Sequence, residues 1–395
     1  MTSPTPAAPT SVAPVRRPGV GSIVAIGLVM AAYRYVLQAG RPSSWHFFAD
    51  AASGLFHGPG LDLYAIHPEY QFGPLAALVA YPFVHLPAWL VRPAVISFGA
   101  ALGIAVLVMV ERTVLALRPG ADPRALRRGL WCAALPVLWA WTDVAVRNEH
   151  IDDALAIVGI VGAALALARR RPWLATLALA VAIAAKPWAV VCLPMLWADQ
   201  GGRHRWARPF VAGAAAVATW VPFVVDEPKT LSALGHFSIV NSASSGLRVL
   251  GVHVARTPTW DRPVQLIAGL AVALLLVRLD RWWAVPAAAL GVRLLLDPGT
   301  HRYYTAGLVV ALLLWELLTH PDGVPWRTIV SVFALEATAT TYAFGAASGR
   351  VRFGVLVLLL LATVGERWRW GRRRRRSMHD HPTAPNPIVL AGSAG

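Results

Sequence analysis

The chain has 395 residues, of which 56% are hydrophobic and 14% charged, and its formal net charge is +16. Apolar runs of spanning length recur from one end to the other, which excludes a soluble globule, because a hydrocarbon core of roughly 30 Å needs about 20 apolar residues in a helix. The basic residues form short clusters between these runs, as in the cytoplasmic loops of membrane proteins, so the charge does not indicate nucleic acid. We therefore predict an all-α polytopic membrane protein whose helices contact membrane lipids.

Three parts are expected along the chain. Residues 1–19, rich in Pro, Ser and Thr, are typical of a disordered cytoplasmic tail, and residues 20–366 of a transmembrane domain. Residues 367–395 are predicted to form a second cytoplasmic tail, basic and disordered. Arg16 and Arg17 precede a first span that is too long for a signal peptide, so we expect it to stay uncleaved.

The arginine clusters mark the cytoplasmic ends of the spans. The expected spans are 20–39, 93–117, 129–146, 152–168, 209–225, 263–278, 282–296, 303–319, 326–346 and 352–366. Between residues 173 and 198 the apolar run is interrupted by Lys186-Pro187, which predicts two short helices that rise and return. This topology has about twelve crossings, with both termini in the cytoplasm.

Residues 72–91 are apolar but contain three prolines and are followed by Arg92. A full crossing here would place the basic loop RPGADPRALRRG outside, against the positive-inside bias. The segment is therefore expected to be a juxtamembrane or re-entrant helix. The outer face then receives most of the carboxylates and histidines.

The first outer loop carries Asp50 directly after WHFFA, in an amphipathic stretch suited to the interface. Asp50 is a candidate general base for a sugar hydroxyl, and its structural alternative is a helix cap or an interface residue. Tyr64 and His67 follow in the same loop. An aromatic ring beside hydrogen-bonding groups suits a sugar, but an aromatic belt at the interface has the same composition.

The sequence RNEHIDDALA places His150, Asp152 and Asp153 at the mouth of a helix. Acceptor binding and helix capping both explain these residues. The density of ligand groups permits a metal ion, but the spacing is not diagnostic, and we predict no metal site.

Arg34, Lys186 and Arg293 lie within or at the ends of apolar spans, where a charge is costly unless it faces a cavity or a partner. Their common sign suits a lipid-linked phosphate, and snorkelling toward headgroups is the alternative. His301 and Arg248 offer donors to an oxyanion on the same face, although each alone is also compatible with a solvated loop. No P-loop, dinucleotide-binding turn, zinc helix or nucleophile elbow is present, so no cofactor is predicted.

Five stretches together resemble the GT-C superfamily of polyprenyl-phosphate-sugar-dependent glycosyltransferases, and more closely glycosyltransferase family 87, the actinobacterial mannosyltransferase-like membrane proteins. They are FADAASGLFHGPGLDLYA, FGPLAALVAYPFVHLP, LATLALAVAIAAKPWAVVCLPMLW, NSASSGLRVLG and LDPGTHRYYTAGLVVAL. The resemblance implies a GT-C-like bundle whose first outer loop covers a membrane-level active site. It implies that Asp50 is the base, and it matches His301 and Lys186 to the family's late histidine and Lys-Pro position.

The chain departs from the family pattern at Gly73-Pro74, where a Pro-Pro pair is usual, at NSASSG and at RNEHIDDALA. The expected function is transfer of a hexose such as mannose from a polyprenyl-phosphate donor to a glycolipid or cell-envelope glycan, on the outer face of the plasma membrane. The alternative is a transporter or flippase for an anionic lipid or glycan, which paired broken helices would favour. A third possibility is a non-catalytic family member that acts in an assembly.

Overall fold

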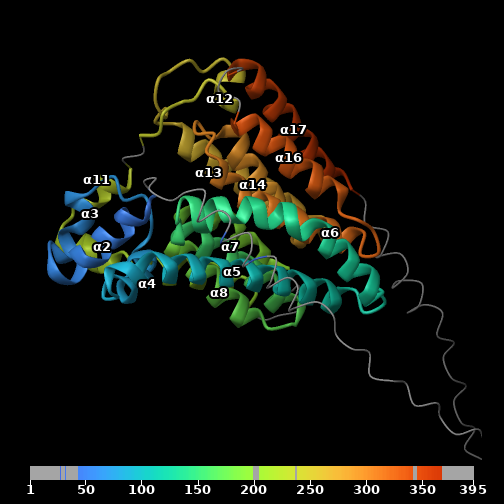
Figure 1. Cartoon of the computed structure of the whole chain (residues 1–395), viewed down its shortest axis with the longest axis horizontal. Coiled ribbons are helices and arrows are strands. Elements are labelled where there is room, and N and C mark those ends of the chain that lie inside the picture. The colour runs from blue at the N-terminus through green and yellow to red at the C-terminus, as the bar shows by residue number, and fades with distance from the viewer. Residues whose placement is uncertain are drawn as a thin grey trace, which may run out of the picture. The chain divides into compact units, whose positions relative to one another are not determined.

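The computed structural model describes residues 27, 32, 43–198, 204–235, 238–340 and 345–366 (Figure 1). In these ranges the chain is helical, apart from turns, loops and one isolated bridge between Val240 and Arg256. The fold class predicted from composition is therefore confirmed as all-α. The predicted first span, with Arg34, and the two predicted tails lie almost entirely outside the described residues.

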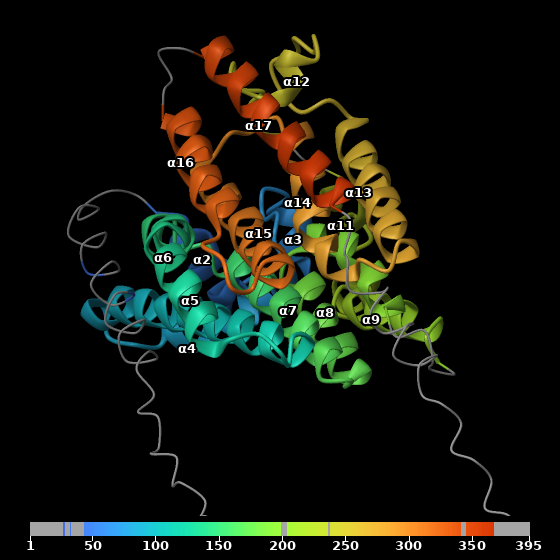
Figure 2. The same cartoon turned by 90° about the vertical axis from the view of Figure 1, so that its right-hand side faces the viewer.

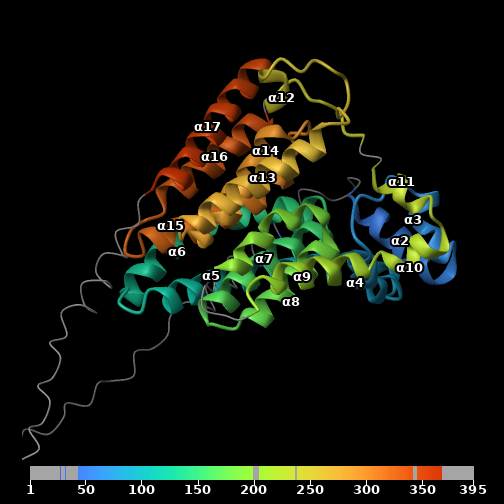
Figure 3. The same ribbon diagram turned by 180° about the vertical axis from the view of Figure 1, so that it is seen from behind.

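Short helices make up the segment that the sequence predicts to lie outside the membrane, and we keep the name first outer loop for it. They are α2 (Trp45–His57), η1 (Gly60–Asp62), α3 (Leu63–Ile66) and α4 (Pro74–Val84). Their buried aromatic and aliphatic residues belong to one hydrophobic cluster, which also includes Val95, Ile151 and Phe223, the last from α10 (Val221–Asp226). In Figures 1 and 3 these helices lie together with α11 (Thr230–Leu234), and α3 contacts α11.

Helix α4 occupies the proline-rich segment for which no full crossing was predicted. It has 11 residues, and at 1.5 Å per residue a helix of this length covers only about half of a hydrocarbon core. Its length agrees with a helix that does not cross by itself. A juxtamembrane position for it stays a prediction.

Within the described ranges, four helices are long and apolar enough to cross a membrane. They are α5 (Ala88–Leu117), α6 (Pro123–Thr142) with its π-helical extension η2 (Asp143–Arg147), α7 (Ile151–Ala168) and α17 (Gly345–Gly365). Helix α7 matches its predicted span closely, whereas α5, α6 and α17 begin earlier than predicted. The count of about twelve crossings stays a prediction.

The other helices are shorter, apart from α13, which has 18 residues as α7 does. They are α8 (Pro172–Ala185), η3 (Pro187–Trp197), α9 (Ala207–Ala218), α12 (Gly246–Val249), α13 (Asp261–Arg278), η4 (Trp282–Ala284), α14 (Val285–Leu296), η5 (Arg302–Tyr304), α15 (Thr305–Thr319) and α16 (Trp326–Thr340). The predicted break at Lys186-Pro187 is present, and the second of the two pieces, η3, is a 3-10 helix. The prediction of a single helix over 209–225 is wrong, because the chain turns between α9 and α10.

Two groups of helices meet at η3. Helix α7 packs against α5 and α8, and α8 packs against α9 (Figure 2). Helices α13 and α14 pack against each other and against η3. Residues at the start of η3 therefore lie between the N-terminal group and the C-terminal group, and this is where charged side chains from both groups meet.

Gly73 allows the backbone of the first outer loop to lie close to the end of α8. Its amide donates to the carbonyl of Ala185 at 2.8 Å, and a Cβ atom at this position would lie 1.9 Å from the carbonyl oxygen of Ala184. A side chain cannot fit without moving one backbone segment, which explains a glycine here.

We expect Gly73→Ala to lower the free energy of unfolding by about 1–3 kcal/mol, the usual cost of overpacking a tight contact. The thermal unfolding midpoint in detergent measures this effect. Gly354→Ala in α17 is the matched control, because a Cβ there meets no atom within 4 Å. Equal midpoints for the two variants would contradict the assignment.

Candidate active site

A pocket of about 300 Å³ opens where the first outer loop, the Lys-Pro break and the C-terminal helices meet. Aromatic rings form much of its wall. The lining residues are Pro68, Tyr70, Gln71, Phe72, Lys186, Pro187, Trp188, Val190, Val191, Trp220, Ile239, Arg262, Gln265, Leu266, Arg293 and Tyr304. Three of them are cations and, among the described residues, none is a carboxylate. The wall therefore presents positive charge between apolar rings.

Arg293 lies above two of these rings. Its guanidinium carbon is 4.8 Å from the ring centroid of Trp188 and 5.1 Å from that of Tyr304. Its Nη2 is 3.9 Å from Oδ2 of Asp297, and the side chain is only 10% exposed. Stacking on both rings holds the planar guanidinium in a fixed orientation, so its remaining donors are available to a ligand.

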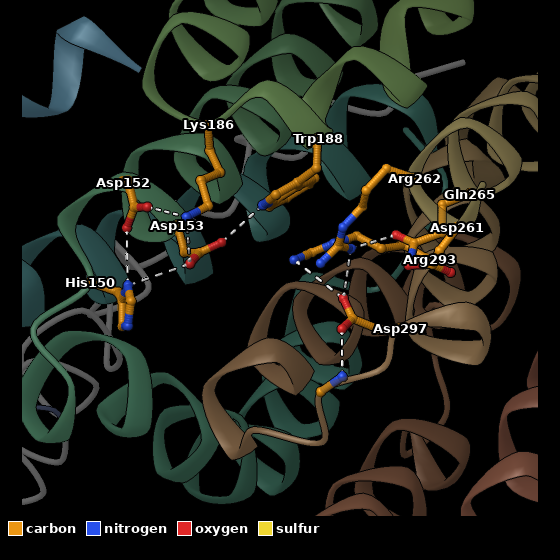
Figure 4. Close-up of polar contacts among 11 residues, drawn as sticks. His150, Asp152, Asp153, Lys186, Trp188, Asp261, Arg262, Gln265, Arg293 and Asp297 are labelled. Atoms are coloured by element: carbon orange, nitrogen blue, oxygen red, sulfur yellow. Dashed lines mark hydrogen bonds and ion pairs between the residues drawn. The ribbon is translucent and has the colours of Figure 1, made fainter. Parts of the chain in front are cut away.

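Asp297 forms ion pairs with two arginines. Its Oδ2 also lies 3.3 Å from Nη1 of Arg262, and its Oδ1 accepts from the amide of Gly299 at 2.9 Å. Two guanidiniums thus share one carboxylate behind the wall (Figure 4). Asp261 is a second buried carboxylate near Arg262, but the two guanidiniums line the pocket and the two carboxylates do not, so the guanidiniums can bind an anionic ligand there.

On the other side, Lys186 pairs with two buried carboxylates. Its ammonium donates a hydrogen bond to Oδ2 of Asp152 and lies 3.9 Å from Oδ2 of Asp153. Asp153 also accepts a hydrogen bond from the indole of Trp188 at 2.9 Å. Ligand atoms of His150, Asp152 and Asp153 lie within 4.8 Å of one another, and the ammonium of Lys186 is the cation among them (Figure 4).

The start of α7 is tied to the first outer loop. Glu149 accepts from Nε of Arg92 at 2.8 Å and from the hydroxyl of Ser43 at 2.6 Å. It has a positive φ of 53°, a conformation that costs energy for a residue with a side chain. These two partners stabilise the conformation and hold the loop ahead of His150 in place.

Asp50 is exposed on α2 and is not part of the described pocket lining. It lies near Tyr70, which does line the pocket. The pKa of Tyr70 is raised, first by burial and then by the negative charges of Asp50 and Glu69. The structure thus places Asp50 beside the wall rather than within it.

The other predicted residues of the first loop have structural partners. Tyr64 is buried, with its ring 4.6 Å from that of Trp220 and 5.0 Å from that of Phe223. His67 pairs with Glu69 at 3.0 Å, at the surface. Neither belongs to the described lining of the pocket, so the geometry does not bring them to a ligand there.

His301 and Arg248 also lie outside the described lining. His301 is exposed and stacks on Tyr303 at 5.5 Å. The pKa of His301 is lowered because its ring is partly desolvated; Asp297 acts against this shift and His150 adds to it. The guanidinium of Arg248 donates to the backbone carbonyl of Asn241 and therefore has a structural partner within its own loop.

Several residues of the pocket were not expected from the sequence. Arg262, Trp188 and Tyr304 line it, and Asp297 lies behind the arginines. A signal existed for Arg262, since it is a cation at the end of a predicted span, as Arg293 is. For Trp188, Tyr304 and Asp297 no such signal was available, because aromatic and acidic residues are common at membrane interfaces.

A search of curated proteins finds no match for the chain. The model of glycosyltransferase family 87 matches residues 70–297, more than half of the chain. The matched segment contains both sides of the pocket, from Tyr70 through Lys186 to Arg293, and the carboxylates behind them. The chain belongs to glycosyltransferase family 87 and is a membrane glycosyltransferase.

Proposed function

We propose that the protein transfers a hexose such as mannose from a polyprenyl-phosphate donor to a glycolipid or cell-envelope glycan, on the outer face of the plasma membrane. The observation that carries this proposal is the pocket in which Lys186, Arg262 and Arg293 line an aromatic wall without a described carboxylate among the lining residues. A sugar phosphate has the matching chemistry, because its ring packs on aromatic faces and its phosphate attracts cations.

The leaving group explains why cations matter. A polyprenyl phosphate leaves as an anion, so it needs stabilisation of negative charge rather than a proton. Fixed donors aimed at developing charge are among the largest contributions to catalysis. Arg293 meets this requirement best, because its stacking on Trp188 and Tyr304 fixes its orientation before the donor binds.

The volume of the pocket also fits the reacting end of the donor, which is its sugar and phosphate. At about 300 Å³, this volume lies at the lower limit for small-molecule sites. The sugar and phosphate would occupy it, while the polyprenyl chain stays in the lipid. The side-chain amide of Gln71 is on the wall and can bond a sugar hydroxyl.

The test uses membranes from a deletion strain, with and without the expressed protein. They are supplied with polyprenyl phosphate carrying radiolabelled mannose, glucose or galactose. We expect one donor to label a new lipid-soluble or polymeric product only when the protein is present.

Two results would overturn the proposal. One is the absence of a new product from all three donors. The other is label that crosses the membrane without forming a new glycosidic bond, which would establish the transporter.

A further inference from the structure

Asp261 is a buried carboxylate behind the wall of the pocket. It is the first residue of α13, ahead of the predicted span 263–278, and its side chain is fully buried. Its Oδ2 accepts a hydrogen bond from Nε2 of Gln265 at 2.8 Å, whereas its Oδ1 has no hydrogen-bond partner in the described part of the chain. Burial with one oxygen unpaired favours the neutral, protonated form of a carboxyl group.

Gln265 connects Asp261 to an arginine of the wall. Its Oε1 accepts from Nη1 of Arg262 at 2.9 Å, while its Nε2 donates to Asp261 (Figure 4). The same Nη1 of Arg262 lies 3.3 Å from Oδ2 of Asp297. A guanidinium only donates and a carboxylate only accepts, so the amide of Gln265 has one favourable orientation between them. Arg262 and Gln265 both line the pocket, and Arg262 is held there by acceptors on two sides.

The proton on Asp261 sets the net charge of a cluster that we define as Asp261, Asp297, Arg262 and Arg293 (Figure 4). With both carboxylates ionised, the charges of the cluster cancel. With Asp261 protonated, the cluster carries one net positive charge. Protonation at the free Oδ1 leaves the hydrogen bond from Gln265 to Oδ2 in place. The proton therefore changes the charge of the wall without breaking the contacts that hold Arg262.

Other charged groups lie near this cluster. Arg352 of α17 interacts with Asp297 and with Glu336 of α16, and His301 also interacts with Asp297. At the start of η3, Lys186 is paired with two carboxylates of α7. Protonation of Asp261 adds one positive charge to whatever field these groups produce.

Asp261 titrates where such a change matters. Burial raises the pKa of Asp261 to about 6 against the opposing effects of Arg262 and Gln265, and the charge of Asp297 adds to the rise. Below this pH the carboxyl is neutral and the wall is more positive, and above it the carboxylate cancels one guanidinium. An anion at the wall favours the protonated state, so an anion and a proton each strengthen the binding of the other.

We propose that Asp261 is a positioning residue of the donor site that takes up a proton when the donor phosphate binds; this inference rests on the proposed function. It holds Arg262 through Gln265 in both of its states. The proton comes from the solvent and binds Oδ1, and no covalent bond of the donor changes in this step. After transfer, loss of the proton returns the cluster to zero net charge, which favours release of the polyprenyl phosphate anion.

The experiment measures the Kd of the methyl ester of polyprenyl phosphate for the full-length protein in nanodiscs. This phosphodiester keeps one charge, because it lacks the second ionisation of a phosphate monoester near about pH 6. We expect the wild-type Kd to rise about 10-fold from about pH 5 to about pH 8, within the usual range of coupling between two sites. Asp261→Asn has the shape of the protonated residue, so its Kd should stay low at every pH.

Asp226→Asn is the matched control, because it removes an exposed carboxylate outside the described pocket lining. Its Kd should follow the wild-type profile. The KM for the polyprenyl-phosphate hexose should show the same pH dependence in each of these proteins. Any titration of His301 persists in Asp261→Asn, so the comparison assigns the effect to Asp261.

Gln265→Met tests the connection independently. It removes the hydrogen bond that stabilises the ionised form of Asp261, so the midpoint of the pH dependence should move to higher pH. It also releases Arg262 on one side, so the Kd should rise at every pH. A purely structural role would raise the Kd and leave the midpoint unchanged.

Two results would overturn the inference. One is a wild-type Kd that does not depend on pH, and the other is a pH dependence that Asp261→Asn retains. Binding with the expected pH dependence, but without hexose transfer from any donor, would overturn the proposed function alone. A wild-type protein that binds the phosphodiester at no pH would overturn both.

Discussion

Replacing Arg293 by glutamine is expected to lower the rate of hexose transfer by about 100- to 1,000-fold. This is the usual effect of removing one fixed hydrogen-bond donor that stabilises the negative charge developing in the transition state. The guanidinium lies over the rings of Trp188 and Tyr304 and lines the pocket. Arg293→Lys should retain part of the activity, because an ammonium keeps the charge but lacks the planar pair of donors. Initial rates against donor concentration measure both effects.

The fold should survive this change. Asp297 keeps Arg262 at 3.3 Å and the amide of Gly299 at 2.9 Å when Arg293 is absent. The matched control is Arg256→Gln, whose side chain bonds Ser238 in an exposed loop outside the described pocket lining. A normal rate and a normal KM for the donor in Arg293→Gln would show that the phosphate binds elsewhere.

Lys186→Met is expected to be the most destabilising of these substitutions. It removes the ammonium that Asp152 and Asp153 share, and all three side chains are at most 14% exposed. Breaking a buried ion pair by removing one partner typically costs about 3–5 kcal/mol, because a charge is left buried without compensation. The midpoint of thermal unfolding in detergent should fall accordingly.

A double substitution distinguishes the destabilisation caused by an unpaired buried charge from the destabilisation caused by lost packing. Lys186→Met with Asp152→Asn should be more stable than Lys186→Met alone, since one of the stranded charges is then removed. Lys229→Met is the control, because Lys229 is an exposed lysine. If Lys186→Met unfolded at the wild-type midpoint, the ion pairs would not hold the start of η3 in place.

The helical architecture was predictable because it depends on local pattern. Apolar runs predicted α7 and the C-terminal ends of α5 and α6 within a few residues, and the Lys186-Pro187 pair predicted the end of α8. Proline lacks an amide hydrogen and restricts the residue before it, so this break is encoded where it occurs. The turn between α9 and α10 was missed, since apolar residues continue through it.

The candidate site was predictable only in part. The cost of a charge in lipid directed attention to Lys186 and Arg293, and both line the pocket. The same reasoning from charge did not separate Asp50 from the carboxylates at the start of α7. Asp50 is exposed, whereas Asp152 and Asp153 are buried around Lys186.

The sequence by itself determined that this protein is a helical membrane protein, and which of its charged side chains need partners. The tertiary structure alone decided which partners they have. Ser44 meets His150 across 106 residues, and Arg262 meets Asp297 across 35. Periodicity shows that a helix is apolar, but lipid is as apolar as a neighbouring helix, so the pattern does not say which helices pack together. The pocket and the ion pairs beside it follow from that packing.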